Sequence, residues 1–171
     1  MRGTTRGSWR KGGGKVIGID ISKKLIEFAR QEEERERLKI RYYVMDACRI
    51  YGFRENSFDL ITCFMALQDI RDYEDAINQV ARVLNNGGKF IFSIPHPCFE
   101  TMTVKGRRID ATERYFGAVR YHIQWNMRRL ANPFTTTAFH RTLTDYSTAL
   151  YKNKLYISRF MEPKPTPRGL R

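Results

Sequence analysis

The sequence lacks long apolar runs and is poor in cysteine. No hydrophobic stretch approaches the roughly 20 residues of a membrane-spanning helix. Residues 1–14 are basic and glycine-rich without an apolar centre, which excludes a secretory signal pattern. The three cysteines, Cys48, Cys63 and Cys98, show neither a pairing pattern nor zinc-ligand spacing, so no metal site is predicted. We therefore expect a cytoplasmic protein with reduced thiols.

Acidic residues are outnumbered in this 171-residue chain, which has a net charge of +13. Residues 100–171 carry more of this excess than residues 1–99. Clustered positive charge attracts nucleic acid or anionic substrates, but it also occurs on surfaces that only contact water. Because no recognisable DNA- or RNA-binding module is present, a nucleotide- or nucleic-acid-binding module stays the alternative interpretation.

Apolar runs and amphipathic segments alternate along the first half of the chain. The expected elements are, in order, strand 16–19, helix 23–37, strand 39–45, strand 58–64, helix 73–84 and strand 89–94. This repetition predicts an α/β fold of the Rossmann-like, doubly wound type with a mostly parallel sheet.

Two local patterns refine the expected helices. In the helix at 23–37, Leu25, Phe28 and Ala29 are expected to form the apolar side. After the helix at 73–84, the sequence Asn-Asn-Gly-Gly at 85–88 is expected to supply the left-handed residues that end it.

The pattern changes at Pro95. Residues 95–140 are rich in aromatic and basic residues with little periodicity, which predicts a lid or substrate-facing insertion. A helix is expected at 143–151 and a last strand at 154–161. The predicted organisation is an irregular segment 1–14, one domain 15–162 that contains the insertion, and a proline-rich tail 163–171.

Two acidic residues follow two successive apolar strands. Asp20 ends the first run and Asp46 the second. Ligands of open α/β sheets bind at the carboxyl ends of the strands, where an acid can accept hydrogen bonds from a ribose diol. The alternative is that both acids only cap helices. A pair at neighbouring strand ends favours a nucleoside site.

An acid such as Asp20 would also suit a nicotinamide-dependent dehydrogenase. However, no Gly-x-Gly-x-x-Gly loop precedes the first strand, and no Tyr-x-x-x-Lys or similar hydride-transfer group is present. A dehydrogenase is therefore disfavoured.

The ordered motifs resemble those of class I S-adenosylmethionine-dependent methyltransferases, of the small-molecule type that includes quinone-methylating enzymes. The matching segments are 16–22 (VIGIDIS), 44–47 (VMDA), 58–67 (FDLITCFMAL), 82–90 (RVLNNGGKF), 93–99 (SIPHPCF) and 139–143 (FHRTL). They span about residues 15–162 in the order and spacing of that family. The resemblance implies a transferase that uses S-adenosyl-L-methionine as cofactor.

The resemblance also assigns cofactor contacts. They are Asp20 for the ribose hydroxyls, Ile21 for the adenine face, Asp46 for the adenine amino group, the Ala47 amide for a ring nitrogen, and Phe64 and Met65 for the methionine end. Gln68 falls where relatives place a polar residue or histidine facing the active site. The proposed partner is a small-molecule acceptor, and neither the acceptor nor the oligomeric state follows from the sequence.

Methyl transfer asks little of side chains, because the sulfonium is already a good leaving group. A base is needed only where the acceptor loses a proton, and His96 and His140 are the candidates. His96 lies between two prolines, so a structural role competes. Tyr115, Tyr121 and Trp125 either line an acceptor pocket or form the packing core of the insertion.

The sequence departs from the family at both ends. The central first strand, its Gly-rich cofactor loop and the last antiparallel strand are expected to be lacking, with residues 3–7 at most a remnant of the loop. Unpaired strand edges each cost stability, so either the strands beside the gap pair directly, another chain fills the gap, or the chain is a fragment of a longer reading frame. We favour the fragment as an expectation. Cofactor affinity and methyl transfer are expected to be impaired.

Overall fold

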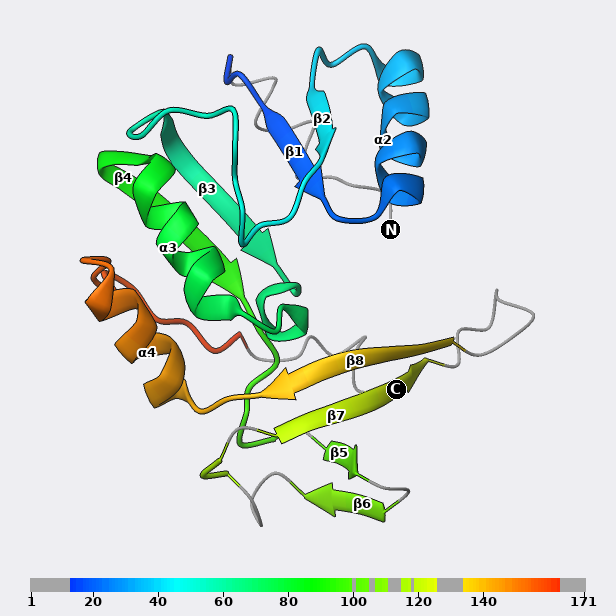
Figure 1. The fold of residues 1–171 in the computed structure, drawn as a ribbon, viewed down its shortest axis with the longest axis vertical. Coiled ribbons are helices and arrows are strands. Elements are labelled where there is room, and N and C mark those ends of the chain that lie inside the picture. Colours follow the sequence, from blue (N-terminus) through cyan, green and yellow to red (C-terminus); the bar gives the residue numbers. More distant parts are fainter. Residues whose placement is uncertain are drawn as a thin grey trace. The chain divides into compact units, whose positions relative to one another are not determined.

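The computed structural model of the chain describes residues 13–99, 101–104, 107–110, 115–117, 119–125 and 134–163. These residues form two units (Figure 1). The first contains Met1–Phe64 and Asp72–Phe92, and the second contains Met65–Arg71 and Ser93–Arg171. The chain therefore leaves the first unit for seven residues after Phe64 and then returns to it.

The first unit begins with a β-α-β element. Strands β1 (Ile17–Asp20) and β2 (Arg41–Val44) pair in parallel, with Asp20 opposite Val44, and helix α2 (Lys23–Glu36) connects them. The Ser22 hydroxyl accepts a hydrogen bond from the Leu25 amide at 3.3 Å and so caps the helix start. This arrangement confirms the first three expected elements.

The core of this element is small and aliphatic on its helix side. Ile26, Ile40 and Tyr42 are buried, and Ala29 packs against them. The expectation that Leu25 shares this side with Ala29 was wrong, because Leu25 is 58% exposed and Phe28 is 59% exposed. The helix turns Ile26 rather than its neighbour Leu25 toward the strands.

Gly18 is required at its position on β1. It lies opposite Tyr42, and a Cβ atom there would lie 2.6 Å from the Tyr42 ring. The strand pair therefore brings its backbone onto the aromatic face, which only glycine permits.

A second parallel pair completes the first unit. Strand β3 (Phe58–Phe64) is linked through helix α3 (Tyr73–Val83) to strand β4 (Leu84–Ser93). The Ser57 amide donates to the Val83 carbonyl at 2.8 Å and the Met65 amide to the Ser93 carbonyl at 2.9 Å, so the strands run parallel. The buried stripe of α3 consists of Ala76, Ile77, Val80 and Val83.

The predicted helix-ending turn at 85–88 is wrong. Leu84 already has the extended backbone of a strand, and residues 85–88 belong to β4. Only Gly87 adopts the left-handed conformation, with φ +77°. The helix ends because Leu84 is buried in the strand that follows, not because glycines interrupt it.

Among the described residues, β1–β2 and β3–β4 are separate two-stranded sheets. No main-chain hydrogen bond of the described strands joins one pair to the other. The expected α/β type with parallel strands is present, and no strand of the described residues connects the two pairs.

The second unit contains antiparallel hairpins, which corrects the interpretation of 95–140 as a segment of little periodicity. Strands β5 (Thr101–Val104) and β6 (Arg107–Asp110) form one hairpin, and β7 (Val119–Trp125) and β8 (Phe134–His140) form a longer one. In β7 apolar residues alternate strictly with Arg120, His122 and Gln124. This period of two is the strand signal that the aromatic composition concealed.

Helix α4 (Leu143–Lys152) follows β8 directly. Thr142 and Asp145 form a capping box, in which the Thr142 hydroxyl accepts from the Asp145 amide at 3.1 Å. The strand expected at 154–161 is absent from the described residues, because this segment pairs with no other strand there. No described helix has both the length and the hydropathy needed to cross a membrane.

Candidate functional site

The two acids predicted from the sequence lie at the same edge of a sheet. Asp20 is the last residue of β1, and the Met45 amide donates to the Asp20 carbonyl at 2.9 Å. Asp46 follows Met45 directly, so both side chains leave the carboxyl ends of neighbouring parallel strands. Both residues are half-buried. This geometry is the one that the nucleoside-site hypothesis requires.

Each carboxylate is held in place by a nearby main-chain amide. Asp20 Oδ1 accepts from the Ser22 amide at 2.7 Å, and Asp46 Oδ1 accepts from the Cys48 amide at 2.9 Å. Neither acid takes part in an ion pair among the described residues. The amide bonded to Oδ1 therefore helps to fix the orientation of each carboxylate, and the Cys48 side chain is a further hydrogen-bond partner of Asp46.

Apolar side chains accompany the acids. Ile21, next to Asp20, is 73% exposed, and Phe64 at the end of β3 is 46% exposed. An exposed isoleucine beside two half-buried carboxylates fits a flat, partly polar group such as an adenine ring, whose face is apolar and whose edge carries donors. These are the residues that the resemblance assigns to the adenosyl part of S-adenosylmethionine.

Met65 has an unusual backbone at the point where the chain enters the second unit. Its φ is +51°, a left-handed value that is uncommon for residues other than glycine. Its amide is held by the Ser93 carbonyl and by the Ser93 hydroxyl at 3.2 Å. Its side chain is 53% exposed, so it is accessible to a ligand.

The Cys48 thiol reports on the charge of Asp46. Burial raises the pKa of the Cys48 thiol to about 11, and the negative charge of Asp46 adds to the effect. Since only the thiolate reacts, alkylation of Cys48 at pH 8 should be about a hundredfold slower than that of an unperturbed cysteine. Replacing Asp46 by asparagine should lower this pKa and speed the reaction. Iodoacetamide labelling followed site by site by mass spectrometry checks both rates, and equal rates in the two proteins would contradict the expectation.

The acceptor-site candidates lie in the second unit. Gln68 belongs to the 3₁₀ turn η1 (Leu67–Asp69), which packs against β8. Its side chain is 8% exposed, and its Oε1 atom has no hydrogen-bond partner among the described residues, while Nε2 donates to Asp69 at 3.4 Å. A buried acceptor without a partner is costly, which marks this atom as one that a ligand can satisfy.

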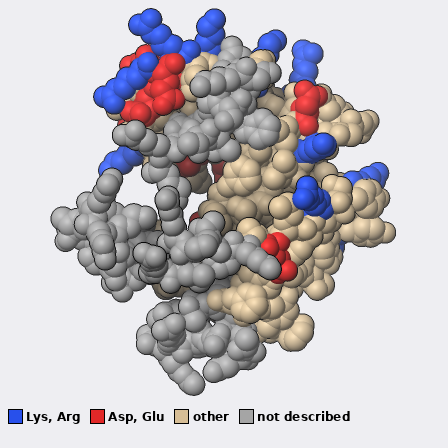
Figure 2. Space-filling model, turned by 180° about the vertical axis from the view of Figure 1, so that it is seen from behind, with Lys and Arg blue, Asp and Glu red and all other residues tan. Residues whose placement is uncertain are grey.

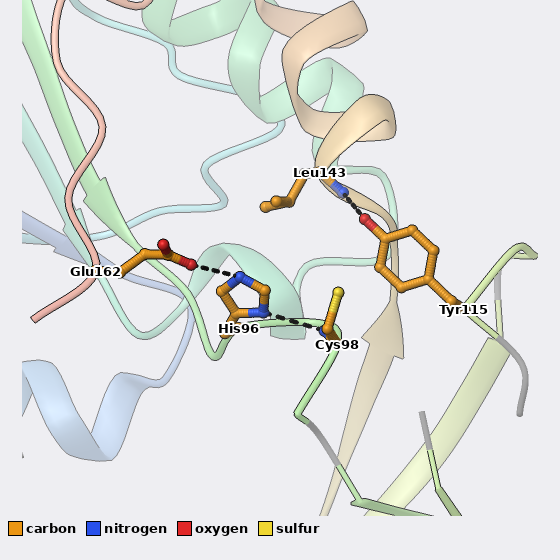
Figure 3. A network of polar contacts seen from close by, with 5 residues as sticks. All are labelled: His96, Cys98, Tyr115, Leu143 and Glu162. Carbon is orange, nitrogen blue, oxygen red and sulfur yellow. Dashed lines mark hydrogen bonds and ion pairs between the residues drawn. The ribbon is translucent and has the colours of Figure 1, made fainter. Parts of the chain in front are cut away.

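Tyr115 and His140 contact one another. The His140 Nε2 atom lies 3.1 Å from the Tyr115 carbonyl, and the two rings meet edge to face at 6.0 Å. Because a carbonyl only accepts, Nε2 carries the proton. The Tyr115 hydroxyl accepts from the Leu143 amide at 3.2 Å, at the start of α4 (Figure 3). Tyr115 therefore joins β8 to α4, and His140 is fully buried behind it.

His96 lies in a different contact network. Its Nε2 is 2.7 Å from Glu162 Oε1, and its Nδ1 accepts from the Cys98 amide at 3.2 Å (Figure 3). The amide at Nδ1 places the imidazole proton on Nε2, facing the carboxylate. Both ring nitrogens are thus engaged, and no dashed line joins His96 to Tyr115 in Figure 3.

The remaining candidates lie on β7. Tyr121 is 1% exposed and pairs with Ala138 on β8, so its ring is part of the packing core. Trp125 pairs with Phe134 through the backbone, and its side chain is outside the described residues. The structure brings Gln68, Tyr115 and His140 into one unit around β8, and it places Asp20, Ile21, Asp46, Ala47 and Phe64 in the other.

Sequence reasoning missed two residues. Arg141 is 5% exposed and donates to three main-chain carbonyls of residues 67–71. Glu162 pairs with His96. The available signal for Arg141 was a lone arginine in an otherwise apolar and threonine-rich stretch. Nothing in the sequence links Glu162 to His96.

A family model described as a methyltransferase domain matches residues 2–92. This chain belongs to the methyltransferase domain family. The match includes both acidic strand ends and the two β-α-β elements of the first unit. It confirms the predicted resemblance.

Curated relatives include the demethylmenaquinone methyltransferase of Oceanobacillus iheyensis, 33% identical over 52% of this chain and 34% of the relative. The ubiquinone biosynthesis O-methyltransferase of Coxiella burnetii is 35% identical over 48% of this chain and 35% of the relative. This methyltransferase-family chain spans about a third of the length of the curated relatives that it matches.

Two solved structures extend the likeness to the second unit. A protein described as a putative S-adenosylmethionine-dependent methyltransferase from Listeria monocytogenes has a TM-score of 0.68 and 25% identity, covering 91% of this chain and 73% of its own. A methyltransferase from Mesorhizobium loti has a TM-score of 0.67 and 25% identity, covering 94% and 73%. The Rossmann-like methyltransferase fold is thereby confirmed, and S-adenosylmethionine is the cofactor of this fold family.

Proposed function

We propose that this chain transfers the methyl group of S-adenosylmethionine to a small-molecule acceptor. The observation that carries the proposal is the pair of carboxylates, Asp20 and Asp46, at one edge of β1–β2, each oriented by a main-chain amide. Asp20 would accept from the ribose hydroxyls and Asp46 from the adenine amino group. S-adenosylmethionine supplies an electrophilic methyl group, so the chain has to bind and orient the reactants.

The remaining contacts follow from the neighbouring side chains. Exposed Ile21 would cover the adenine face, and the Ala47 amide would donate to a ring nitrogen. Phe64 and Met65, both about half exposed, would contact the methionine end. In the second unit, Gln68, Tyr115 and Trp125 remain the candidates for acceptor contacts, whereas Tyr121 is 1% exposed and packs in the core.

We propose a hydroxylated aromatic acceptor of the quinol type. The support is the names of two similar proteins, a demethylmenaquinone methyltransferase and a ubiquinone biosynthesis O-methyltransferase. Methylation of a hydroxyl oxygen releases a proton, for which His96 and His140 are the candidate bases. The proton can pass to His96 only if the imidazole leaves one of its two present contacts.

The direct test is transfer of a radiolabelled methyl group from S-adenosylmethionine to a small hydroxylated quinol. Millimolar cofactor and long incubation allow transfer to be detected even if the affinity for the cofactor is low. Label should move to the quinol with the wild-type chain and not with an Asp20→Ala, Asp46→Ala double variant. Label transfer that is equal in both proteins, or absent at saturating cofactor, would contradict the proposal.

A nucleotide- or nucleic-acid-binding module remains the alternative function. On the face that Figure 2 shows, the lysines and arginines of the described residues are scattered and lie beside acidic residues. Some of the basic side chains are paired with acids, as Arg35 is with Glu32 on α2. Steeply salt-dependent binding of RNA or DNA would favour the alternative.

A further inference from the structure

The turn that carries Gln68 is fastened to the second unit by one buried arginine. Residues 65–71 interrupt the chain of the first unit, yet they belong to the second. Arg141 Nη2 donates to the Ile70 carbonyl at 2.6 Å and to the Arg71 carbonyl at 2.8 Å, and Nη1 donates to the Leu67 carbonyl at 3.4 Å. One guanidinium thus holds both ends of η1 across some seventy positions of sequence.

The arginine itself has a rigid base. It lies between the last residue of β8 and the capping box of α4, which Thr142 and Asp145 form directly after it. Its Cζ atom is 5.1 Å from the centre of the Phe139 ring. Strand β8, the Phe139 ring and the start of α4 therefore hold the Arg141 guanidinium in place. Little side-chain rotamer freedom is lost when it binds the carbonyls of residues 67–71.

The η1 turn carries a polar side-chain atom whose hydrogen-bonding capacity is unused among the described residues. Within the described part of the chain, no group hydrogen-bonds the Oε1 atom of Gln68, although this side chain is 8% exposed. Its amide nitrogen donates to Asp69, so the buried oxygen is the polar atom of this side chain that lacks a partner among the described residues. Such an oxygen accepts only from an N–H or O–H group, so it selects ligands that carry a donor.

We propose that Arg141 is a positioning residue that holds η1 so that Gln68 Oε1 accepts a hydrogen bond from a hydroxyl or amino group of the methyl acceptor. This inference rests on the proposed function for the identity of the ligand. It deepens that function by stating the chemical class of the acceptor, a molecule that carries a hydrogen-bond donor. An ether or a hydrocarbon of the same shape is rejected, because it leaves Gln68 Oε1 without a partner.

The test combines two measurements that need no methyl transfer. Amide hydrogen exchange is followed by NMR at Asp69 and Ile70, whose amides close the η1 turn, with the Met45 amide as a reference in the first unit. The Gln68 side-chain amide signal is then titrated with catechol and with 1,2-dimethoxybenzene, which has the same ring but no donor. The proteins compared are wild type, Arg141→Lys, Arg141→Met and, as a matched control, Arg159→Met at an exposed position.

In Arg141→Met, exchange at Asp69 and Ile70 should rise at least tenfold while exchange at Met45 changes less than twofold, and the response to catechol should be lost. Arg141→Lys should lie between this variant and wild type, since lysine keeps the charge but cannot reach all three carbonyls. Wild type and Arg159→Met should respond to catechol and not to the dimethyl ether. Unchanged exchange in both Arg141 variants, or equal responses to the two probes, would overturn the inference.

These readouts separate the inference from the proposed function. Failure of label transfer with an intact, donor-selective Gln68 response would contradict methyl transfer alone. Label transfer with an unchanged η1 turn in Arg141→Met would contradict the role of Arg141 alone. A global loss of structure in Arg141→Met would raise amide exchange at Met45 as well. In that case, exchange at Asp69 and Ile70 in Arg141→Lys tests the role of Arg141.

Discussion

Replacing Asp20 by asparagine should weaken the binding of S-adenosylmethionine by about tenfold to a hundredfold. Asparagine keeps the shape of the side chain and still accepts from the Ser22 amide, so the strand end should stay in place. What is lost is the charge, and a hydrogen bond to a charged acceptor contributes about 1.5–3 kcal/mol. Each 1.4 kcal/mol corresponds to about a tenfold change in affinity.

Isothermal titration calorimetry of wild type and Asp20→Asn measures this difference. Asp59→Asn is the matched control, because Asp59 is an exposed acid within β3 rather than at the carboxyl end of β1. Its affinity should equal that of wild type within about twofold. If Asp20→Asn and Asp59→Asn weakened binding equally, net charge rather than a ribose contact would explain the effect.

Replacing Gln68 by methionine should stabilise the fold and impair its function. Methionine has a similar length but no polar atom, and the buried Oε1 has no partner among the described residues. A buried polar group without a partner costs about 1–3 kcal/mol, so the free energy of unfolding should rise by about 1–2 kcal/mol. The same change removes the hydrogen-bond acceptor, and methyl transfer to a hydroxylated acceptor should fall at least tenfold.

Urea unfolding and the label-transfer assay measure the two effects in one variant. Gln31→Met, on the exposed face of α2, is the control and should change stability by less than about 0.5 kcal/mol. A Gln68→Met protein that is less stable than wild type would show that Oε1 stabilises the fold. Gln68 would then be a structural residue. Its replacement would lower the stability of the fold, whereas replacing a functional residue often raises stability and lowers activity.

Local patterns were sufficient to predict most of the first unit. The apolar run that ends at Asp20, the Ser22 cap and the run at 58–64 each determine an element by themselves, and the structure places those elements within about two residues. The position of Asp20 and Asp46 at one edge also followed, because parallel strands joined by a helix must end on the same side. The buried side of α2 was predicted wrongly because Leu25 and Ile26 are neighbours, and only tertiary packing decides which of the two is buried.

The second unit depends on contacts between distant residues. A strand at 154–161 requires a partner strand, and local propensity does not provide one. Likewise, the contact of Arg141 with residues 67–71 and that of Glu162 with His96 each join positions more than sixty residues apart. The alternation in β7 was available in the sequence, but it was hidden by basic and aromatic residues that fit no helical period.

The most direct test of the cofactor site is an NMR titration with S-adenosylhomocysteine, followed at the Ser22 and Cys48 amides. These two amides donate to the carboxylates of Asp20 and Asp46, so each reports on one acid. If one adenosyl group contacts both acids, the two signals shift together with a single dissociation constant. A titration in which only one amide shifts, or in which neither shifts at saturating ligand, would contradict the account.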